Sequence, residues 1–256
     1  MDRANLKFEW KMKKLFTFCF LLVSIVAWAQ DNSSQSFRHL KKTKLPRAGI
    51  EFWYNPGTTT VYDISLKTAD AGLLDEIRGI ADDEYNIEHG FLVAKTEIAP
   101  GDACYVVYIA GWDEGFRFCR PRAEKELGAL WPHGLLVVPG EGMVYTRHHR
   151  NNFDARRKFR LEKDSIVEVK QPYLYVGLKS KTLREVKIYD NREKSGVIAT
   201  LPAGYEIEIL LAESDRTDGD KGFYLVRTGF GLCGWAELAA AQGTSVDVEG
   251  LEYRGD

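Results

Sequence analysis

A thiol and an imidazole can together form a nucleophilic pair, and the chain contains the residue types for one. The thiol of such a pair needs a lowered pKa, which a helix N-terminus or a neighbouring cation provides. Elimination leaves Cys119 with His133 or His148. Cys104 and Cys119 both fall in segments of strand-like composition, away from any expected helix start. A Gly-x-Ser-x-Gly elbow and a phosphate-binding loop are absent from the sequence, so we expect no catalytic residue and no enzyme.

The one concentration of basic residues offers a different chemistry, the binding of anions. Arginine can hold a carboxylate or a phosphate through two parallel hydrogen bonds. The same segment is also typical of a solvated loop, because Asp154 and Glu162 offset part of its charge. Adjacent histidines point to opposite faces of a strand, so the sequence predicts no metal site. The basic patch comprises Arg147, His148, His149, Arg150, Arg156 and Arg157.

The N-terminus has the order of a secretory signal. Two lysines precede an apolar run from Leu15 to Trp28, and small residues follow at a position suited to cleavage. We expect residues 1–29 to be a signal peptide that is cut before Gln30, with the true start at Met1 or Met12. The run is shorter than the roughly 20 residues that span a bilayer, and no other such run follows, so no membrane span is expected after cleavage.

Composition limits the classes of protein that the remainder can be. Of the 256 residues 45% are hydrophobic, which excludes wholesale disorder. Cleavage would leave 30 basic and 35 acidic residues, a net charge of -5. A dedicated nucleic-acid binder needs a strongly basic face, so no nucleic-acid partner is expected. Residues 30–47 are polar and basic, and we expect a flexible leader there.

Three cysteines remain after cleavage, an odd number for an oxidising compartment. The segment from Cys104 to Arg120 has the pattern of a hairpin in which Cys119 lies opposite Tyr108. That register sets Cys104 and Cys119 about 13 Å apart, whereas a disulfide needs Cα atoms within ~7 Å. We therefore expect Cys104, Cys119 and Cys233 to be free and buried.

The spacing of apolar residues predicts a mainly β fold. Segments rich in β-branched and aromatic residues predict strands at 90–95, 103–110, 116–120, 135–138 and 143–147. Two segments have apolar residues close to helical spacing, 70–82 and 122–130. We expect residues 48–178 to form a β-rich domain with these two short helices.

Five short strands with turns between them follow in residues 182–238. Such a series in about 60 residues can close into a small barrel, which removes exposed sheet edges. The run Ile198–Gly204, the strand Tyr205–Leu210 and the pair Gly234-Trp235 resemble the bacterial SH3-like (SH3b) domain of exported and cell-wall proteins. The resemblance implies a non-catalytic barrel over residues 179–240 that binds peptidoglycan or peptides. Residues 241–256 are expected to be a frayed acidic tail.

Aromatic side chains are the candidate ligand contacts of this segment, because a flat ring gives a large contact area at low entropic cost. Large aromatic residues also pack in cores, so some of them are expected to be structural, Trp235 above all. The candidates are Tyr189, Tyr205, Tyr224 and Trp235.

The sequence thus predicts an exported binding or interaction module of the periplasm or cell envelope. Its partner would be a cell-wall glycopeptide or an envelope protein, and no cofactor is expected. The alternative is a cell-wall hydrolase that uses the Cys–His pair in the N-terminal domain.

Overall fold

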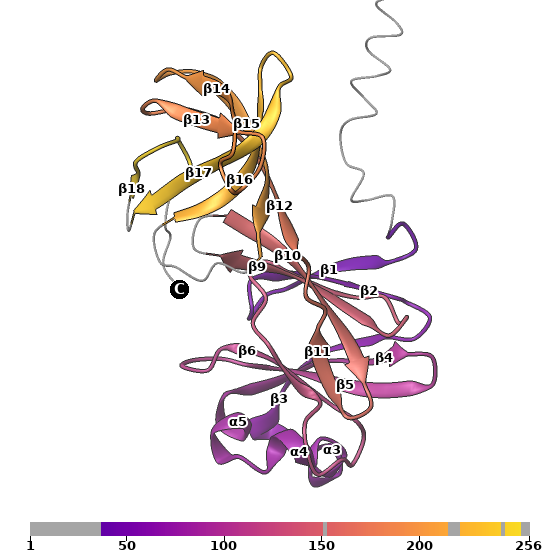
Figure 1. Ribbon diagram of the computed structural model, residues 1–256. Coiled ribbons are helices and arrows are strands. Elements are labelled where there is room, and N and C mark those ends of the chain that lie inside the picture. Colours follow the sequence, from indigo (N-terminus) through magenta and orange to yellow (C-terminus); the bar gives the residue numbers. More distant parts are fainter. Residues whose placement is uncertain (1–36, 151–152, 215–220, 242–243, 252–256) are drawn as a thin grey trace, which may run out of the picture. The chain divides into compact units, whose positions relative to one another are not determined.

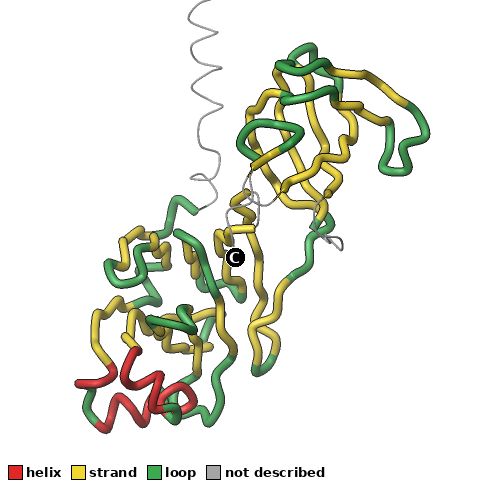
Figure 2. Tube along the Cα trace, turned by 90° about the vertical axis from the view of Figure 1, so that its left-hand side faces the viewer, coloured by secondary structure: helices red, strands yellow, loops and turns green. Residues whose placement is uncertain are grey.

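Strands make up most of the described residues in the computed structural model, and the fold is mainly β, as the sequence predicts (Figure 2). The structure describes residues 37–150, 153–214, 221–241 and 244–251, and the side chains of 149, 150, 221, 240, 241, 244 and 245 are not described. The expected signal peptide, 1–29, and the first part of the expected leader, 30–36, lie outside these residues.

The first sheet has six strands in the order β1-β2-β8-β9-β10-β11 (Figure 1). Neighbours are antiparallel except β2 and β8, which run parallel. The strands are β1 (Lys41–Leu45), β2 (Ile50–Tyr54), β8 (Leu135–Val138), β9 (Met143–Arg150), β10 (Phe153–Glu162) and β11 (Ser165–Glu168).

The second sheet is antiparallel, in the order β3-β4-β5-β6-β7. Its strands are β3 (Thr60–Ser65), β4 (Gly90–Ala99), β5 (Asp102–Ile109), β6 (Gly115–Cys119) and β7 (Gly128–Leu130). Between β3 and β4 lie the 3-10 helix η1 (Leu66–Thr68) and the helices α3 (Ala71–Glu76), α4 (Arg78–Ala81) and α5 (Glu84–His89).

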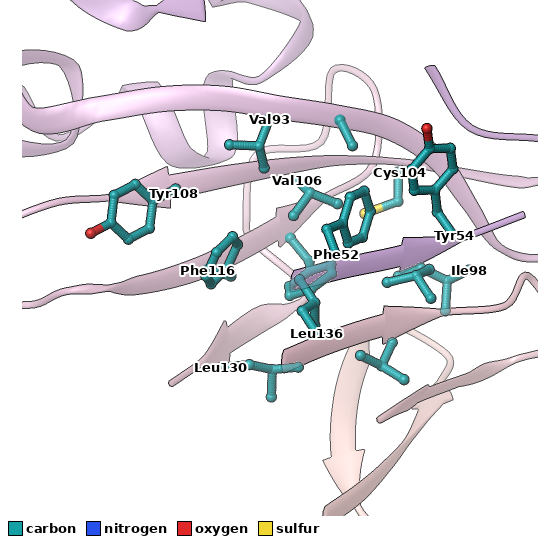
Figure 3. Packing of buried hydrophobic residues seen from close by; sticks show 14 of the residues in the cluster. Phe52, Tyr54, Val93, Ile98, Cys104, Val106, Tyr108, Phe116, Leu130 and Leu136 are labelled. Atoms are coloured by element: carbon teal, nitrogen blue, oxygen red, sulfur yellow. The ribbon is translucent and has the colours of Figure 1, made fainter. Parts of the chain in front are cut away.

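The alternation of side chains along β5 and β6 separates two cores. One face of the second sheet packs Val106, Phe116 and Phe118 against Phe52 and other residues of the first sheet (Figure 3). The opposite face packs against the helical segment, with Leu66, Ile77 and Ile80 among the residues of that core. Because neighbours in a strand point to opposite faces, the two cores share one sheet.

The third sheet follows the order β12-β15-β16-β17-β13-β14, and β18 pairs with β17. It contains the five strands expected in residues 182–238 and begins with β12, which starts before the expected domain boundary at 179. Within the described residues, the end strands β12 and β14 are not paired with each other, so closure into an SH3-like barrel stays a prediction. The strands are β12 (Tyr173–Lys181), β13 (Val186–Tyr189), β14 (Val197–Leu201), β15 (Glu206–Glu213), β16 (Lys221–Thr228), β17 (Cys233–Ala241) and β18 (Thr244–Ser245).

The helical predictions need correction. The expected helix 70–82 is broken at Ile77, and the helix expected at 122–130 is a loop that leads into β7. In that loop the backbone N–H of Leu127 donates to the carbonyl of Phe118, and Arg122 has a φ of 56°, which a helix does not allow. A Cβ on Gly79 would lie 2.8 Å from the carbonyl oxygen of Ala123, so glycine allows this loop to approach α4. The apolar spacing at 122–130 therefore reflects packing of a loop.

Two segments expected to be irregular are ordered parts of the fold. The end of the expected leader forms β1, whose five residues all pair with β2. The strand was not predicted because its three lysines give it a polar composition, and such charged side chains are typical of an edge strand. The expected frayed tail contains Asp247, Val248 and Leu251, which are all buried. Asp247 accepts hydrogen bonds from the backbone N–H of Ala239 and from the Arg184 guanidinium.

Candidate binding site

A cleft of about 560 Å³ opens at one end of the third sheet, where β12 ends, β15 begins and β16 ends. We call it the end cleft. Its wall includes the segment after β18, where the N–H of Glu249 donates to the carbonyl of Lys181 at 2.9 Å. Ser180 lies at the cleft and donates from its hydroxyl to the carbonyl of Glu249 at 2.7 Å. The supposed tail thus helps to build the cleft.

Charges of both signs line the end cleft in equal number. Lys181 and Glu206 face each other across β12 and β15, with Nζ 3.9 Å from Oε1. Arg227 forms an ion pair with Glu208 on the next strand pair. A ligand that carries both ammonium and carboxylate groups would find a complementary group for each. The charged lining residues are Lys179, Lys181, Glu206, Glu208, Arg227 and Glu249.

Phe230 stands beside these charges on the turn between β16 and β17, with 84% of its surface exposed. The turn is fixed by its backbone, since the N–H of Gly231 donates to the carbonyl of Thr228 at 2.9 Å. The N–H of Leu232 donates to the Thr228 hydroxyl at 3.0 Å. Gly231 has a φ of 97°, a conformation that favours glycine. A short, hydrogen-bonded turn therefore holds an unpacked aromatic ring at the cleft.

The outer face of the same sheet carries a row of apolar and aromatic side chains, one from each of six strands. Directly paired residues place their side chains on the same face, and all six members are exposed or half-buried. We call this set the aromatic row. It runs Tyr175, Leu211, Leu225, Trp235, Tyr189 and Val197 from β12 to β14.

The aromatic row adjoins the end cleft. Leu225 of the row and Arg227 of the cleft are two residues apart on β16, so their side chains share a face at a spacing of about 7 Å. Trp235 lies in the middle of the row, with its ring centroid 5.6 Å from that of Tyr173. The Arg192 guanidinium lies 5.9 Å from the Trp235 centroid and pairs with Glu213, which raises the pKa of Arg192. The row and the cleft form one continuous surface.

The structure brings together two of the four predicted aromatic contacts. Tyr189 and Trp235 are register partners in the aromatic row. Tyr205 is half-buried against the core, and its backbone pairs with Thr182. The prediction that Tyr224 contacts a ligand is corrected, because its side chain is 2% exposed and belongs to the core. Phe230 was not among the predicted contacts. Its position between Gly229 and Gly231 could have indicated an aromatic side chain exposed on a turn.

The predicted basic patch divides between the two faces of the β9–β10 hairpin. Arg147 and Arg156 are direct register partners on the outer face. His148 points to the opposite face, where its register partner Ala155 is buried. The side chains of His149 and Arg150 lie outside the described residues. The six residues therefore do not form one patch.

Arg157 has a structural partner. Its Nε donates to Oε1 of Glu168 on β11 at 2.7 Å, and its second nitrogen also contacts that carboxylate. Such a bidentate pair occupies the guanidinium fork. Arg157 therefore joins β10 to β11 and is not part of an open basic surface.

The expected hairpin register around the cysteines is wrong. Cys119 lies opposite Tyr105, so it is displaced by only one residue from Cys104. The two cysteines nevertheless point to opposite faces of the sheet. Cys104 points into the core beside Phe52 (Figure 3), and Cys119 points into the core beside the helices. Both are free and buried, as expected, whereas Cys233 is free and exposed. Opposite faces, and not distance along the strand, keep Cys104 and Cys119 apart.

The structure does not bring Cys119 to either candidate histidine. His133 and His148 line a pocket of about 190 Å³ together with Tyr108 and Phe116. Tyr108 and Phe116 belong to the core on the face of the sheet opposite to Cys119. Burial raises the pKa of the Cys119 thiol to about 12, and burial also raises the pKa of Cys104. Both thiols are protonated at neutral pH.

Within the described residues, no three His, Cys, Asp or Glu side chains gather closely enough to hold a metal ion. None of the helices in this part of the chain is both long and apolar enough to cross a bilayer. No protein-family model, curated protein or solved structure matches the chain.

Proposed function

We propose that this protein is an exported, non-catalytic binding module of the cell envelope, and that it holds a short cell-wall glycopeptide in the end cleft. The observation that carries the proposal is the cleft itself, which has charges of both signs and an unpacked phenylalanine at its margin. Its volume of about 560 Å³ falls in the ordinary range of small-ligand sites, roughly 300–1,000 Å³.

A glycopeptide matches the chemistry of this lining. Its peptide supplies carboxylate and ammonium groups for Lys181, Arg227 and Glu206, which all line the cleft. Its sugar rings offer flat faces to Phe230 and to the adjoining aromatic row. A concave site of this size suits such a ligand better than a protein partner, because protein interfaces bury about 800 Å² on each side.

The proposal that the protein is exported rests on the signal-like order of residues 1–29. The SH3-like assignment rests on the resemblance of residues 182–238, to which the five consecutive strands β13–β17 lend support. The proposal of a non-catalytic role is supported by the protonated state and the separate faces of Cys104 and Cys119.

Replacing Phe230 with alanine should weaken binding to purified peptidoglycan by about tenfold, the equivalent of ~1.4 kcal/mol. The ring is exposed in the free protein, so its removal costs little folding energy. Co-sedimentation of the wild-type and variant proteins over a range of peptidoglycan concentrations measures the change, and thermal unfolding checks the fold.

Trp112→Ala is the matched control, because Trp112 is a fully exposed aromatic on the β5–β6 turn and does not line the end cleft. This variant should co-sediment as the wild type does. The proposal fails if the wild type does not co-sediment at any salt concentration, or if the two alanine variants lose binding equally.

A further inference from the structure

The outer face of the first sheet carries more basic than acidic side chains. The inner side chains of β2, β8, β9 and β10 form the core, so the alternate side chains point outward in cross-strand rows. One row runs Lys44, Glu51, Leu135, Arg147 and Arg156. The next row runs Lys42, Trp53, Val137, Tyr145 and Lys158. We call these two rows the cationic face.

The cationic face contains Arg147 and Arg156 of the predicted basic patch, together with two of the β1 lysines of the expected leader. The two rows contain five basic residues and one acidic residue, Glu51, in a chain whose formal net charge is -2, and Asp154 lies on the same side of β10 beside Arg147. At a strand spacing of about 4.8 Å, the lysines of β1 lie roughly 14 Å from Arg147 and ~19 Å from Arg156. Positive charge is therefore segregated onto a broad surface, where it raises the local concentration of anions.

At one end of this face, the positive charges of Arg147 and Arg156 are not fully neutralised by carboxylates. Like charges directly opposite each other on neighbouring strands are destabilising. Arg147 donates from Nε to the carbonyl of His133 at 2.8 Å, and the same Nε is 3.8 Å from Asp154. Arg156 has no carboxylate within ion-pair distance in the described part of the chain, and burial and Arg147 lower its pKa. A bound anion would relieve the repulsion between the two guanidinium groups.

The two aromatic rings at the centre of the face, Trp53 and Tyr145, are half-buried, and each has a lysine ammonium near it. The Lys42 ammonium lies 3.8 Å from the centroid of the Trp53 ring, and the Lys158 ammonium lies 6.0 Å from that of Tyr145. Bases of a single-stranded nucleic acid need open ring faces to stack on. Neither Leu135 nor Val137 is exposed enough to enter a bilayer interface. Contacts at this face are therefore ionic, and the spread of the cations suits an extended chain better than a single small ion.

We propose that the cationic face is a second binding surface, separate from the end cleft, and that it binds a carboxylate-bearing polysaccharide. Successive carboxylates of such a polymer would reach Arg147, Arg156 and Lys158 at one end of the face and Lys42 and Lys44 at the other. The guanidinium groups hold carboxylates through paired hydrogen bonds.

Polygalacturonate oligomers of defined length test this proposal by calorimetric titration of the full chain. The wild type should bind at low salt, more tightly as the oligomer lengthens, and binding should weaken as salt screens the charges. The double variant Arg156→Gln/Lys158→Gln should lose about tenfold or more in affinity. Lys170→Gln/Lys187→Gln removes the same charge from exposed positions off the face and should leave affinity within about twofold.

The proposal is overturned if the wild type does not bind the oligomers at low salt, or if the two double variants lose affinity equally. Tighter binding to phosphatidylglycerol vesicles or to single-stranded DNA than to the oligomers would also overturn it. Phe230→Ala should bind polygalacturonate as the wild type does, so failure at the cationic face and failure at the end cleft are separate results.

Discussion

Replacing Tyr224 with alanine should lower the free energy of unfolding by about 3–5 kcal/mol. The side chain is 2% exposed and belongs to the core of the third sheet. Its register partners Ala212 and Ala236 are small, and small neighbours cannot fill the space that the ring would leave. Urea denaturation of the wild type and the variant measures the difference.

Tyr175→Ala is the matched control on the same sheet, because Tyr175 is 62% exposed on the outer face. Its unfolding free energy should stay within about 0.5 kcal/mol of the wild type. If Tyr224→Ala kept its stability and lost only glycopeptide binding, Tyr224 would be a ligand contact and the placement of this side chain in the core would be wrong.

Cys233 should react with iodoacetamide in the native protein, whereas Cys104 and Cys119 should react only after denaturation. Only the thiolate is a nucleophile. With a pKa of about 12, Cys119 has a thiolate fraction at pH 7.5 that is more than ~1,000 times below that of a free thiol of pKa about 8.5. Burial slows alkylation further, because it blocks access. Mass spectrometry of timed reactions at pH 7.5 measures the three rates.

The same raised pKa makes stability depend on pH in the alkaline range. Below the pKa of a free thiol, Cys119 is protonated in both the folded and the unfolded chain, so its contribution is fully present there. The contribution is lost as pH rises towards about 12, because the unfolded chain releases the proton first. Cys119→Ala should show a shallower decline of stability over that range. Rapid alkylation of native Cys119 would instead indicate an activated thiol and would support the alternative function, a hydrolase with a Cys–His pair.

The sequence predicts the strands of this fold better than its helices and edges. Runs of β-branched and aromatic residues mark β4, β5 and β8, and β5 has a core on each of its faces. Apolar and polar residues alternate in β13, which has one face against a core. β1 has no such alternation, because lysines occupy an edge strand. The loop at 122–130 has helical spacing, but its backbone bonds go to Phe118 and Ile166 of other segments. Tertiary hydrogen bonds of this kind leave no local signal.

The candidate site was predictable only in part. The aromatic residue types alone predict Tyr189 and Trp235 as ligand contacts. Pairing between strands that are distant in the sequence places the two residues in one row. The end cleft depends on Glu249, whose segment returns to β12 over a long sequence separation. The cationic face combines residues more than 100 positions apart, Lys42 and Lys158 among them. Pairing between strands that are distant in the sequence decides both surfaces, with three strands at the end cleft and five at the cationic face, and no local pattern encodes it.

The most direct test of the central claim maps where a glycopeptide binds. Soluble disaccharide-peptide fragments of peptidoglycan are titrated into the isotopically labelled protein, and backbone amide chemical shifts are followed by NMR. The shifts should change in a saturable way at Gly229, Phe230 and Gly231, and at Lys181 and Glu206 across the end cleft. Absence of saturable changes, or changes confined to residues outside the end cleft and the aromatic row, would contradict the account.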